Sequence, residues 1–358
     1  MLQTTYFLGA NSPSGFYSLY DQLSALDRLY ILKGGPGCGK STLMKRIARH
    51  AEAAGLDTQL ILCSADPDSL DAVILPQKGI AVADGTAPHV MEAACPGAVE
   101  TYVDLSRFYD HDALQTVKNE LIATTAEYKG HYKQAYRCLG AAGELRRNLP
   151  EAADSWELRQ KLEKRAAGII SRELKKAAPS GQRTEQRFLS AVTHSGVTHL
   201  WDTVSAQADR VYELADRHGL AHHLLSPILA AACAAGHSVV ACPDPMAPDR
   251  LAHLIFPDLS LAFVTSTPEA PWPHRPWRRL RLDAMAAEHL RTADKPRLRF
   301  TGRVAEALTS DGISNLAQAK AAHDRLEALY NPHVDFDGVL SLADHLAEQI
   351  LSASAPHS

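Results

Sequence analysis

The sequence repeats itself at an offset of 181 residues, and this repeat constrains the fold more than any single motif does. Phe7–Asp21 aligns without gaps with Phe188–Asp202, and seven of the fifteen positions are identical. After a slip of one residue, the same offset relates Pro76 to Pro257 farther along the chain. Chance similarity does not keep its register over roughly eighty residues. We therefore expect one structural unit to occur twice.

Each copy is expected to belong to the α/β class. In the first copy, the apolar runs Arg28–Gly34, Asp57–Ala65 and Gly79–Ala83 have the length of strands and end in polar or glycine-containing turns. Ser41–Ala54 has helical periodicity and is followed by Gly55. Strands that alternate with helices favour a parallel sheet with helices on both faces, with the carboxyl ends of its strands along one edge.

The segment between the two sheets predicts long helices. Residues 112–178 are rich in Lys, Arg, Glu and Ala, and Trp156, Leu162 and Ile169 recur at helical spacing. We expect a helical hairpin that projects from a first domain at residues 1–181. The second domain, residues 182–358, is expected to end in further helices.

A glycine-rich motif lies between the strand predicted at Arg28–Gly34 and the helix predicted at Ser41–Ala54. It fits G-x-x-x-x-G-K-[ST] fully, in the context that a phosphate-binding loop requires. Glycines allow positive φ angles, so successive N–H groups can surround a phosphate, and the following helix N-terminus adds partial positive charge. The motif predicts a P-loop NTPase-type fold in which a nucleoside triphosphate contacts Gly34, Gly35, Pro36, Gly37, Cys38, Gly39, Lys40, Ser41 and Thr42.

Catalytic and metal-binding residues are expected around the same loop. Lys40 is placed to reach the β- and γ-phosphates, and the hydroxyl of Ser41 is a Mg²⁺ ligand in such sites. Asp84 ends the third apolar run, where a second contact to Mg²⁺ is needed, although an Asp-Gly pair is also an ordinary strand-ending turn. ATP is favoured over GTP because no Asn-Lys-x-Asp motif follows the loop.

Three further acidic residues follow the second apolar run. We predict that Asp66 orients water or an acceptor, because P-loop enzymes place such a residue there. The alternative is a solvated acidic turn that includes Asp68 and Asp71. His89 is expected in a surface loop rather than facing the γ-phosphate.

The second copy lacks the residues that this chemistry needs. The register places His222, or Ala221 if the slip falls later, opposite the lysine of the loop, and only Gly219 remains of the loop glycines. Thr265 stands where the first copy has its strand-ending aspartate. The sequence therefore predicts one working nucleotide site and a second copy that keeps the fold without the chemistry.

Two basic regions indicate a protein or nucleic-acid partner. One is the predicted hairpin, and the other is Pro271–Leu282, where Trp272 and Trp277 alternate with arginines. Aromatic rings beside arginines are typical of single-stranded nucleic-acid surfaces, whereas the alternative is a proline-stiffened connector whose tryptophans pack on the domain. The net charge of -4 gives no overall attraction to nucleic acid, so any such contact would be local.

The composition also bears on the compartment. The 6 cysteines have no paired spacing, which is typical of reduced thiols. No run approaches the ~18 apolar residues that a membrane span needs. We expect a cytoplasmic protein that makes no membrane contact.

Several motifs outside the loop extend the pattern. They are DPDSLDAVILP at Asp66–Pro76, DGTAPHV at Asp84–Val90, PGAVE at Pro96–Glu100 and ALYNPHVDF at Ala328–Phe336. With GGPGCGKST at Gly34–Thr42, they make the chain similar to an uncharacterised family of bacterial tandem P-loop ATPases of about this length. The resemblance implies ATP binding and hydrolysis. In such relatives the second half can carry its own glycine loop, which this chain lacks.

Three functions fit these features. The first is a slow Mg²⁺-dependent ATPase that couples hydrolysis to a conformational change or to partner binding. The second is a kinase for a nucleotide or another small molecule, since GGPGCGK and Asp84-Gly85 are similar to features of adenylate-type kinases. The third is a scaffold that binds ATP with negligible turnover.

Overall fold

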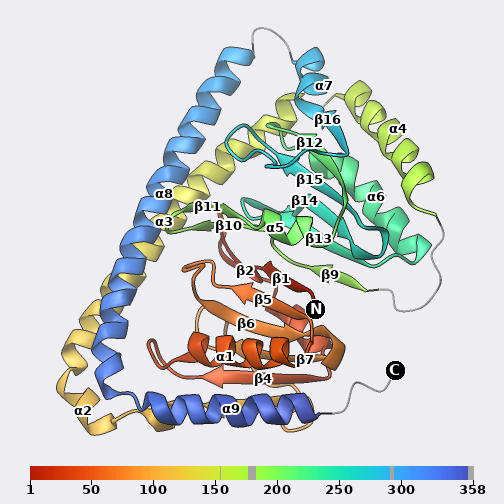
Figure 1. The fold of residues 1–358 in the computed structure, drawn as a ribbon. Helices are drawn as coiled ribbons and strands as arrows, with labels where there is room; N and C mark the ends of the chain where they lie inside the picture. The colour runs from red at the N-terminus through yellow and green to blue at the C-terminus, as the bar shows by residue number, and fades with distance from the viewer. Residues whose placement is uncertain (154, 176–182, 291–293, 354–358) are drawn as a thin grey trace.

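The structure, a computed structural model, describes residues 1–153, 155–175, 183–290 and 294–353, and it contains two six-stranded sheets connected by long helices (Figure 1). The first sheet has the strand order β1-β5-β6-β7-β4-β8. Its strands are β1 (Gln3–Tyr6), β4 (Arg28–Lys33), β5 (Thr58–Leu62), β6 (Leu70–Leu75), β7 (Ile80–Asp84) and β8 (Glu100–Asp104).

The second sheet repeats this order. Read from the matching edge, its order is β9-β13-β14-β15-β12-β16. Its strands are β9 (Thr184–Gln186), β12 (Arg210–Ala215), β13 (Val239–Asp244), β14 (Ala247–Phe256), β15 (Leu261–Ser266) and β16 (Arg278–Arg281). The two copies found in the sequence thus form two sheets of the same strand order.

The expectation of a parallel sheet is wrong for one strand of each sheet. β6 is antiparallel to both of its neighbours, and β14 is likewise antiparallel to both of its own. The cause is the length of the connections. Only the short 3-10 turns η2 (Pro76–Lys78) and η4 (Pro257–Leu259) precede the next strand, whereas a parallel pair needs a crossover of a dozen residues or more.

The inner faces of the two sheets enclose one shared hydrophobic core. Two hairpins and two short helices lie with it: β2 (Gly9–Ser12) with β3 (Gly15–Ser18), β10 (Ser190–Thr193) with β11 (Gly196–His199), η1 (Tyr20–Ala25) and α5 (Trp201–Ser205). Phe7 and Phe188 exchange backbone hydrogen bonds of 2.9 and 2.8 Å across the centre of this core. Long helices therefore cover only the outer face of each sheet, and not both faces as the sequence predicted.

The helices on the outer faces are exchanged between the halves (Figure 1). On the first sheet, α1 (Lys40–Ala53) packs with α9 (Phe336–Ser352), which comes from the end of the chain. On the second sheet, α6 (Ala221–Ala235) packs with α4 (Trp156–Glu173), which directly follows the first half. The sheets themselves lie within residues 1–181 and 182–358, but each is completed by a helix from the other range.

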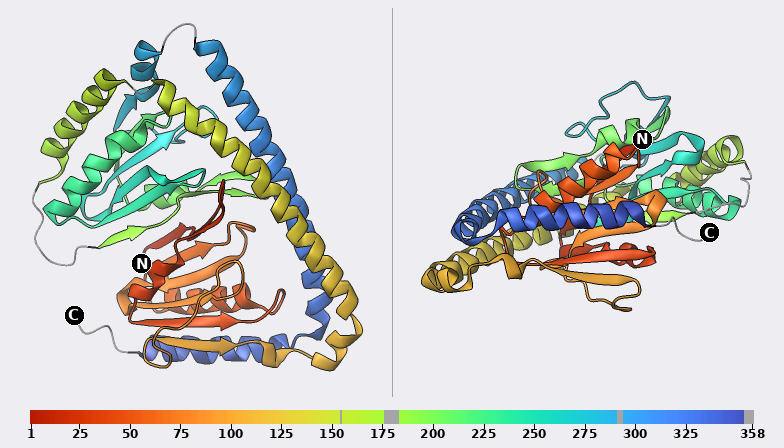
Figure 2. Two further views of the ribbon diagram at one scale, coloured as in Figure 1. Left: turned by 180° about the vertical axis from the view of Figure 1, so that it is seen from behind. Right: turned by 60° about the horizontal axis from the view of Figure 1, so that its bottom comes forward.

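The predicted helical hairpin at residues 112–178 is also wrong. The helix α3 (Lys118–Ala153) pairs along its length with α8 (Lys295–Tyr330), and the two run side by side in opposite directions (Figures 1 and 2). The apolar face of α3 meets α8 at Leu139 and Leu316, whereas Leu158 of α4 is buried against the second sheet. α3 and α4 thus bury their apolar faces against different partners.

Short elements connect these parts. η3 (Ser106–Phe108) and α2 (His111–Thr116) precede α3, α7 (Leu282–His289) follows β16, and η5 (Asn331–His333) joins α8 to α9. Within the residues that the structure describes, none of the helices combines the length and the apolar character that crossing a membrane requires.

Candidate functional site

The glycine-rich motif connects β4 to α1, as the sequence predicted, and we call Gly34–Ser41 the glycine loop. Gly37 and Gly39 have φ angles of 69° and 84°, which L side chains rarely adopt, and Gly39 forms the N-cap of α1. Cys38 is buried beneath the loop, and burial raises the pKa of its thiol. The loop therefore ends at a helix N-terminus, the part of a helix that favours anions.

Lys40 and Asp84 come together at this loop. β4 and β7 are parallel neighbours whose register pairs Leu32 with Asp84, so the end of β7 lies beside the start of the loop. The Lys40 ammonium lies 3.5 Å from Asp84 Oδ2, and both side chains are 13% exposed. It also donates to the carbonyl oxygens of Gly34 (2.6 Å) and Gly35 (3.0 Å).

The remaining residues predicted for Mg²⁺ and nucleotide lie on the first turn of α1 and at the end of β7. The hydroxyl oxygen of Ser41 accepts a 2.9 Å hydrogen bond from the backbone N–H of Leu70, and Thr42 is exposed. Asp84 Oδ1 accepts from the N–H and the hydroxyl of Thr86 at 2.8 and 2.6 Å. The second oxygen of Asp84 is the one that faces Lys40.

His89 and Asp71 are buried, which corrects the surface loop predicted for His89 and excludes Asp71 from the solvated turn that was the alternative. Asp71 is 4% exposed and accepts a 2.9 Å hydrogen bond from the Tyr20 hydroxyl. His89 is 6% exposed, and its Nε2 lies 3.4 Å from Asp71. Burial lowers the pKa of His89, but the Asp71 carboxylate outweighs it, so that pKa lies above its usual value. Asp71 is the second residue of the antiparallel strand β6 and not part of the turn before it.

Asp66 lies in the turn before β6. Its carboxylate accepts a hydrogen bond from the Ser69 hydroxyl at 3.1 Å and from the N–H of Asp68 at 3.3 Å. Lys320 of α8 lies 3.5 Å from its Oδ2. Asp66 therefore holds its own turn and contacts the long helix pair.

Side chains from the segment between η3 and α2 and from the junction of α8 with η5 contact the glycine loop. We call these three residues, Tyr109, Tyr330 and Asn331, the loop cover. A methyl group at Gly35 would lie 2.9 Å from the Tyr109 hydroxyl, and the two tyrosine rings are 5.6 Å apart. With its amide nitrogen facing the carbonyls, Asn331 donates to Gly37 O at 3.0 Å. Tyr330 and Asn331 belong to the ALYNPHVDF motif, whose sequence alone gave no sign of this contact.

The corresponding loop of the second half contains its own anion. Asp216 follows β12 directly, where the first half has Gly34 after β4. Its carboxylate accepts hydrogen bonds from the N–H groups of His218 (2.9 Å) and Ala221 (2.6 Å), at the start of α6. Burial raises the pKa of Asp216 to about 6 despite these bonds. An internal carboxylate thus occupies the N–H groups that a phosphate would use.

The other substitutions predicted in the second half have structural roles. α1 begins at Lys40 and α6 at Ala221, so the helix starts place Ala221, and not His222, opposite the lysine. His222 Nδ1 accepts from the N–H of Leu251 at 3.0 Å. Thr265 pairs with Leu214 as Asp84 pairs with Leu32, and its hydroxyl donates to Ala252 O at 2.6 Å.

Within the basic region Pro271–Leu282, the two tryptophans differ in exposure. Trp272 is 7% exposed and packs edge-on against Trp201, which agrees with the alternative of a packed connector. Trp277 is 57% exposed, and Arg278, Arg279 and Arg281 lie on the edge strand β16. Among the described residues, one group has metal-ligand proximity: His323, Asp324 and Glu327 on the last turns of α8.

Comparison with known proteins adds no relative to this geometry. No family model, no curated protein and no solved structure matches the chain.

Proposed function

We propose that the first half binds MgATP at the glycine loop and hydrolyses it slowly, in the manner of a P-loop NTPase. The observation that carries this proposal is the 3.5 Å approach of Lys40 to Asp84 beside the glycine loop. A lysine on the loop and a carboxylate at the end of a parallel neighbouring strand are the two charges that a triphosphate with its Mg²⁺ requires. The motif alone could not place these two residues together.

Each residue has a part in binding. The N–H groups of the loop and the start of α1 would hold the phosphates, and Lys40 would leave the carbonyl oxygens of Gly34 and Gly35 to contact them. Ser41 and Asp84 would hold Mg²⁺, which neutralises phosphate charge when bound. The Ser41 oxygen uses one lone pair to accept from the N–H of Leu70, and its second lone pair would be the one to bind Mg²⁺.

Slow hydrolysis follows from the surroundings of the loop. Phosphoryl transfer depends mainly on positioning and on charge stabilisation. The loop cover contacts Gly35 and Gly37, so it must withdraw before phosphates enter, and this couples binding to the α8–α9 junction. The buried pair of His89 and Asp71 is a better candidate to orient water than Asp66, whose carboxylate is engaged by its own turn.

Binding of a fluorescent ATP analogue with Mg²⁺ tests the proposal. We expect Lys40→Ala to lose binding at least 100-fold, because the lysine contacts phosphates directly. Lys45→Ala on the same helix is the matched control, since Lys45 is exposed and donates to Asp68 O. Tight binding by the Lys40 variant would refute the site.

The fate of γ-labelled phosphate separates the three functions in the presence of a metabolite pool. Label in free phosphate supports the ATPase. Label in an organic acceptor supports a kinase instead. Binding without release of label, even with cell extract, supports the scaffold.

A further inference from the structure

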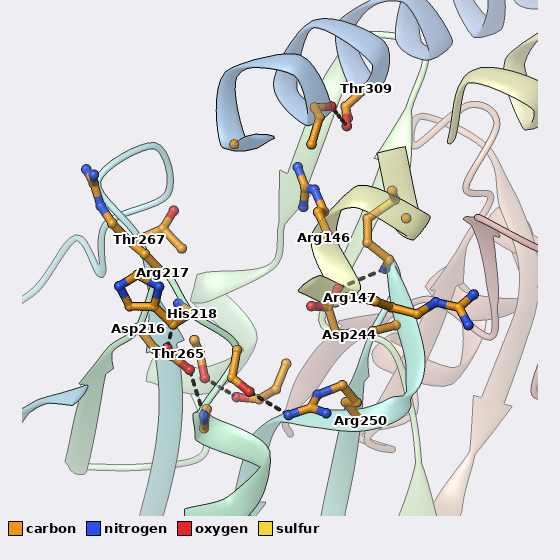
Figure 3. A pocket seen from close by; sticks show the side chains of 18 of the residues that line it. Arg146, Arg147, Asp216, Arg217, His218, Asp244, Arg250, Thr265, Thr267 and Thr309 are labelled. Carbon is orange, nitrogen blue, oxygen red and sulfur yellow. Dashed lines mark hydrogen bonds between the residues drawn. The ribbon is translucent and has the colours of Figure 1, made fainter. Parts of the chain in front are cut away.

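A large open pocket lies at the carboxyl edge of the second sheet, in the position that the glycine loop and its cover fill in the first half (Figure 3). Its volume is about 2200 Å³. The ends of β12 and β15, the start of β14 and the facing ends of α3 and α8 form its walls. Ligands of open α/β sheets bind outside the carboxyl ends of the strands, so this is the edge at which a second ligand is expected.

Arginines from at least five separate segments line the pocket, and one of them is Arg159 of α4. Arg146 comes from α3, Arg217 from the loop after β12 and Arg250 from β14, as Figure 3 shows. Arg299 and Arg303 come from the start of α8. In the described parts of the chain, Arg146, Arg299 and Arg303 take part in no ion pair. Guanidinium groups gathered around a pocket without carboxylate partners favour an anionic ligand.

The acidic residues of the lining do not cancel this charge. Among the described residues, eight lysines and arginines and six aspartates and glutamates line the pocket. Four of the carboxylates are already engaged, by backbone N–H groups or by arginines: Asp216, Asp244, Glu144 and Glu269. Because Asp216 occupies the N–H groups at the start of α6, a ligand would be held by side chains along the walls and not by a phosphate ring.

The size and the spread of charge select the kind of anion. Pockets for small molecules have volumes of roughly 300–1,000 Å³, well below the volume of this one. A duplex carries its phosphates on the outside of a stiff rod, whereas the arginines here stand on separate walls of one pocket. Tyr17, which is 36% exposed, offers an aromatic ring in the same lining. Spread positive charge with an exposed ring is the pattern that holds single strands.

We propose that the pocket of the second half binds single-stranded nucleic acid, with the arginines of α3, β14 and α8 along its phosphates and Tyr17 against a base. This site is separate from the proposed ATP site and does not depend on it. The second half would then supply a binding function in place of the nucleotide chemistry that it lacks.

Fluorescence anisotropy with a labelled twelve-nucleotide oligo-uridine, and with its deoxythymidine counterpart, tests the proposal on the full chain. We expect Arg299→Glu/Arg303→Glu to weaken binding at least tenfold. Each lost phosphate contact also lowers the slope of log K against log salt by about 0.7, so the double variant should lose about 1.4. Tyr17→Ala should weaken binding about tenfold without changing this slope, because stacking involves no counterion release.

The matched control has the same change in charge. Arg165→Glu/Arg297→Glu alters one exposed residue of α4 and one of α8 that do not line the pocket. This control variant should bind the oligonucleotide as the wild type does. If both double variants weakened binding equally, the effect would come from the overall charge of the protein, and the proposed site would be overturned. Circular dichroism and thermal unfolding confirm that each variant is folded.

Three other outcomes would also overturn the proposal. They are a wild-type chain that fails to bind the oligonucleotide at low salt, a multiply phosphorylated peptide that binds more tightly through the same arginines, and ATP alone that displaces the strand from the pocket. Lys40→Ala should leave oligonucleotide binding unchanged, so loss of the ATP site and loss of this site are measured independently.

Discussion

In the first half, β4 leads into a glycine loop whose Lys40 lies 3.5 Å from Asp84, whereas in the second half β12 leads into Asp216, whose carboxylate bonds to the N–H groups at the start of α6. The two sheets have the same strand order, so the difference does not arise from the fold. An N-terminal helix turn favours an anion in both halves. In the second half the chain itself provides that anion.

The surroundings of the two loops also differ: the first loop is covered by other side chains, whereas the second borders an open pocket. The loop cover closes on the first loop, and a pocket of about 2200 Å³ opens beside the second. Tyr330 of the loop cover ends α8, and the end of α3 and the start of α8 line the pocket, so the α3 and α8 pair connects the two surroundings (Figure 2). A movement of α3 and α8 would therefore change both the glycine loop of the first half and the pocket of the second half.

The largest effect is expected from the exchanged outer helices. Leu158 of α4 is fully buried in the core on the second sheet, and Leu346 of α9 is buried on the first. Truncating either leucine to alanine should lower the free energy of unfolding by about 2–5 kcal/mol. Denaturant unfolding with hydrogen exchange checks this: Leu158→Ala should expose the amides of α6, and Leu346→Ala those of α1. If Leu158→Ala instead exposed the amides of the first half, or Leu346→Ala those of the second half, the swapped positions of α4 and α9 would be contradicted.

The swapped positions of α4 and α9 are the part of the fold that local sequence pattern does not predict. Strand β4, the glycine loop and helix α1 follow from local pattern and turn chemistry, and the structure has them where the pattern placed them. The apolar stripe of α4 shows that one face is buried but carries no information about which sheet buries it. The reversal of β6 was readable in principle, because Pro76–Lys78 is too short for a crossover.

In the candidate site too, some residues could be predicted from the sequence and others could not. Lys40 and Asp84 could be predicted, since a motif and a strand end specify their positions. The burial of His89 beside Asp71 and the contact of Asn331 with the loop are tertiary, and they join residues that are far apart in sequence. Asp216 did leave a signal, a carboxylate in the place of the first loop glycine, but its meaning depends on the hydrogen bonds that it makes.

Asp216 contributes a decline of stability with rising pH, opposite in sign to the contribution of His253, whose pKa burial lowers to about 3. Burial raises the pKa of its carboxyl from 3.8 to about 6 in the folded chain. The folded state then holds a proton on this carboxyl that the unfolded state has lost, so the contribution of Asp216 to the free energy of unfolding falls as pH rises from about 4 to 6 and is level above. The loss is on the order of 3 kcal/mol.

Urea denaturation between pH 4 and 7 measures this contribution. Asp216→Asn keeps an acceptor oxygen but no longer titrates, so the free energy of unfolding of the wild type minus that of the variant should fall as pH rises from about 4 to 6. A difference that does not change with pH would show that Asp216 makes no such contribution. Asp84→Asn in the first half is the matched control, and its pH profile should run parallel to that of the wild type.

The next effect concerns Asp84 and Thr265, which lie at corresponding strand ends of the two halves. Asp84→Asn should lower ATP turnover about 100-fold, equivalent to about 2.7 kcal/mol of barrier, because the neutral amide no longer offsets the charge of Mg²⁺. Thr265→Ala, at the corresponding position of the second half, should leave turnover unchanged. Phosphate release at saturating ATP compares the two, and equal losses would show that the strand ends act through stability.

The smallest effect should come from loosening the loop cover. Asn331 donates to the carbonyl oxygens of Gly37 and Glu327, at 3.0 and 3.1 Å, and thereby ties the α8–α9 junction to the glycine loop. A net hydrogen bond contributes about 0.5–1.5 kcal/mol, so Asn331→Ala should raise the affinity for ATP about two- to tenfold if the cover must withdraw. Isothermal titration measures the change. A lower affinity would mean that Asn331 holds the nucleotide-bound form, and the cover would then be part of the binding site and not a barrier to it.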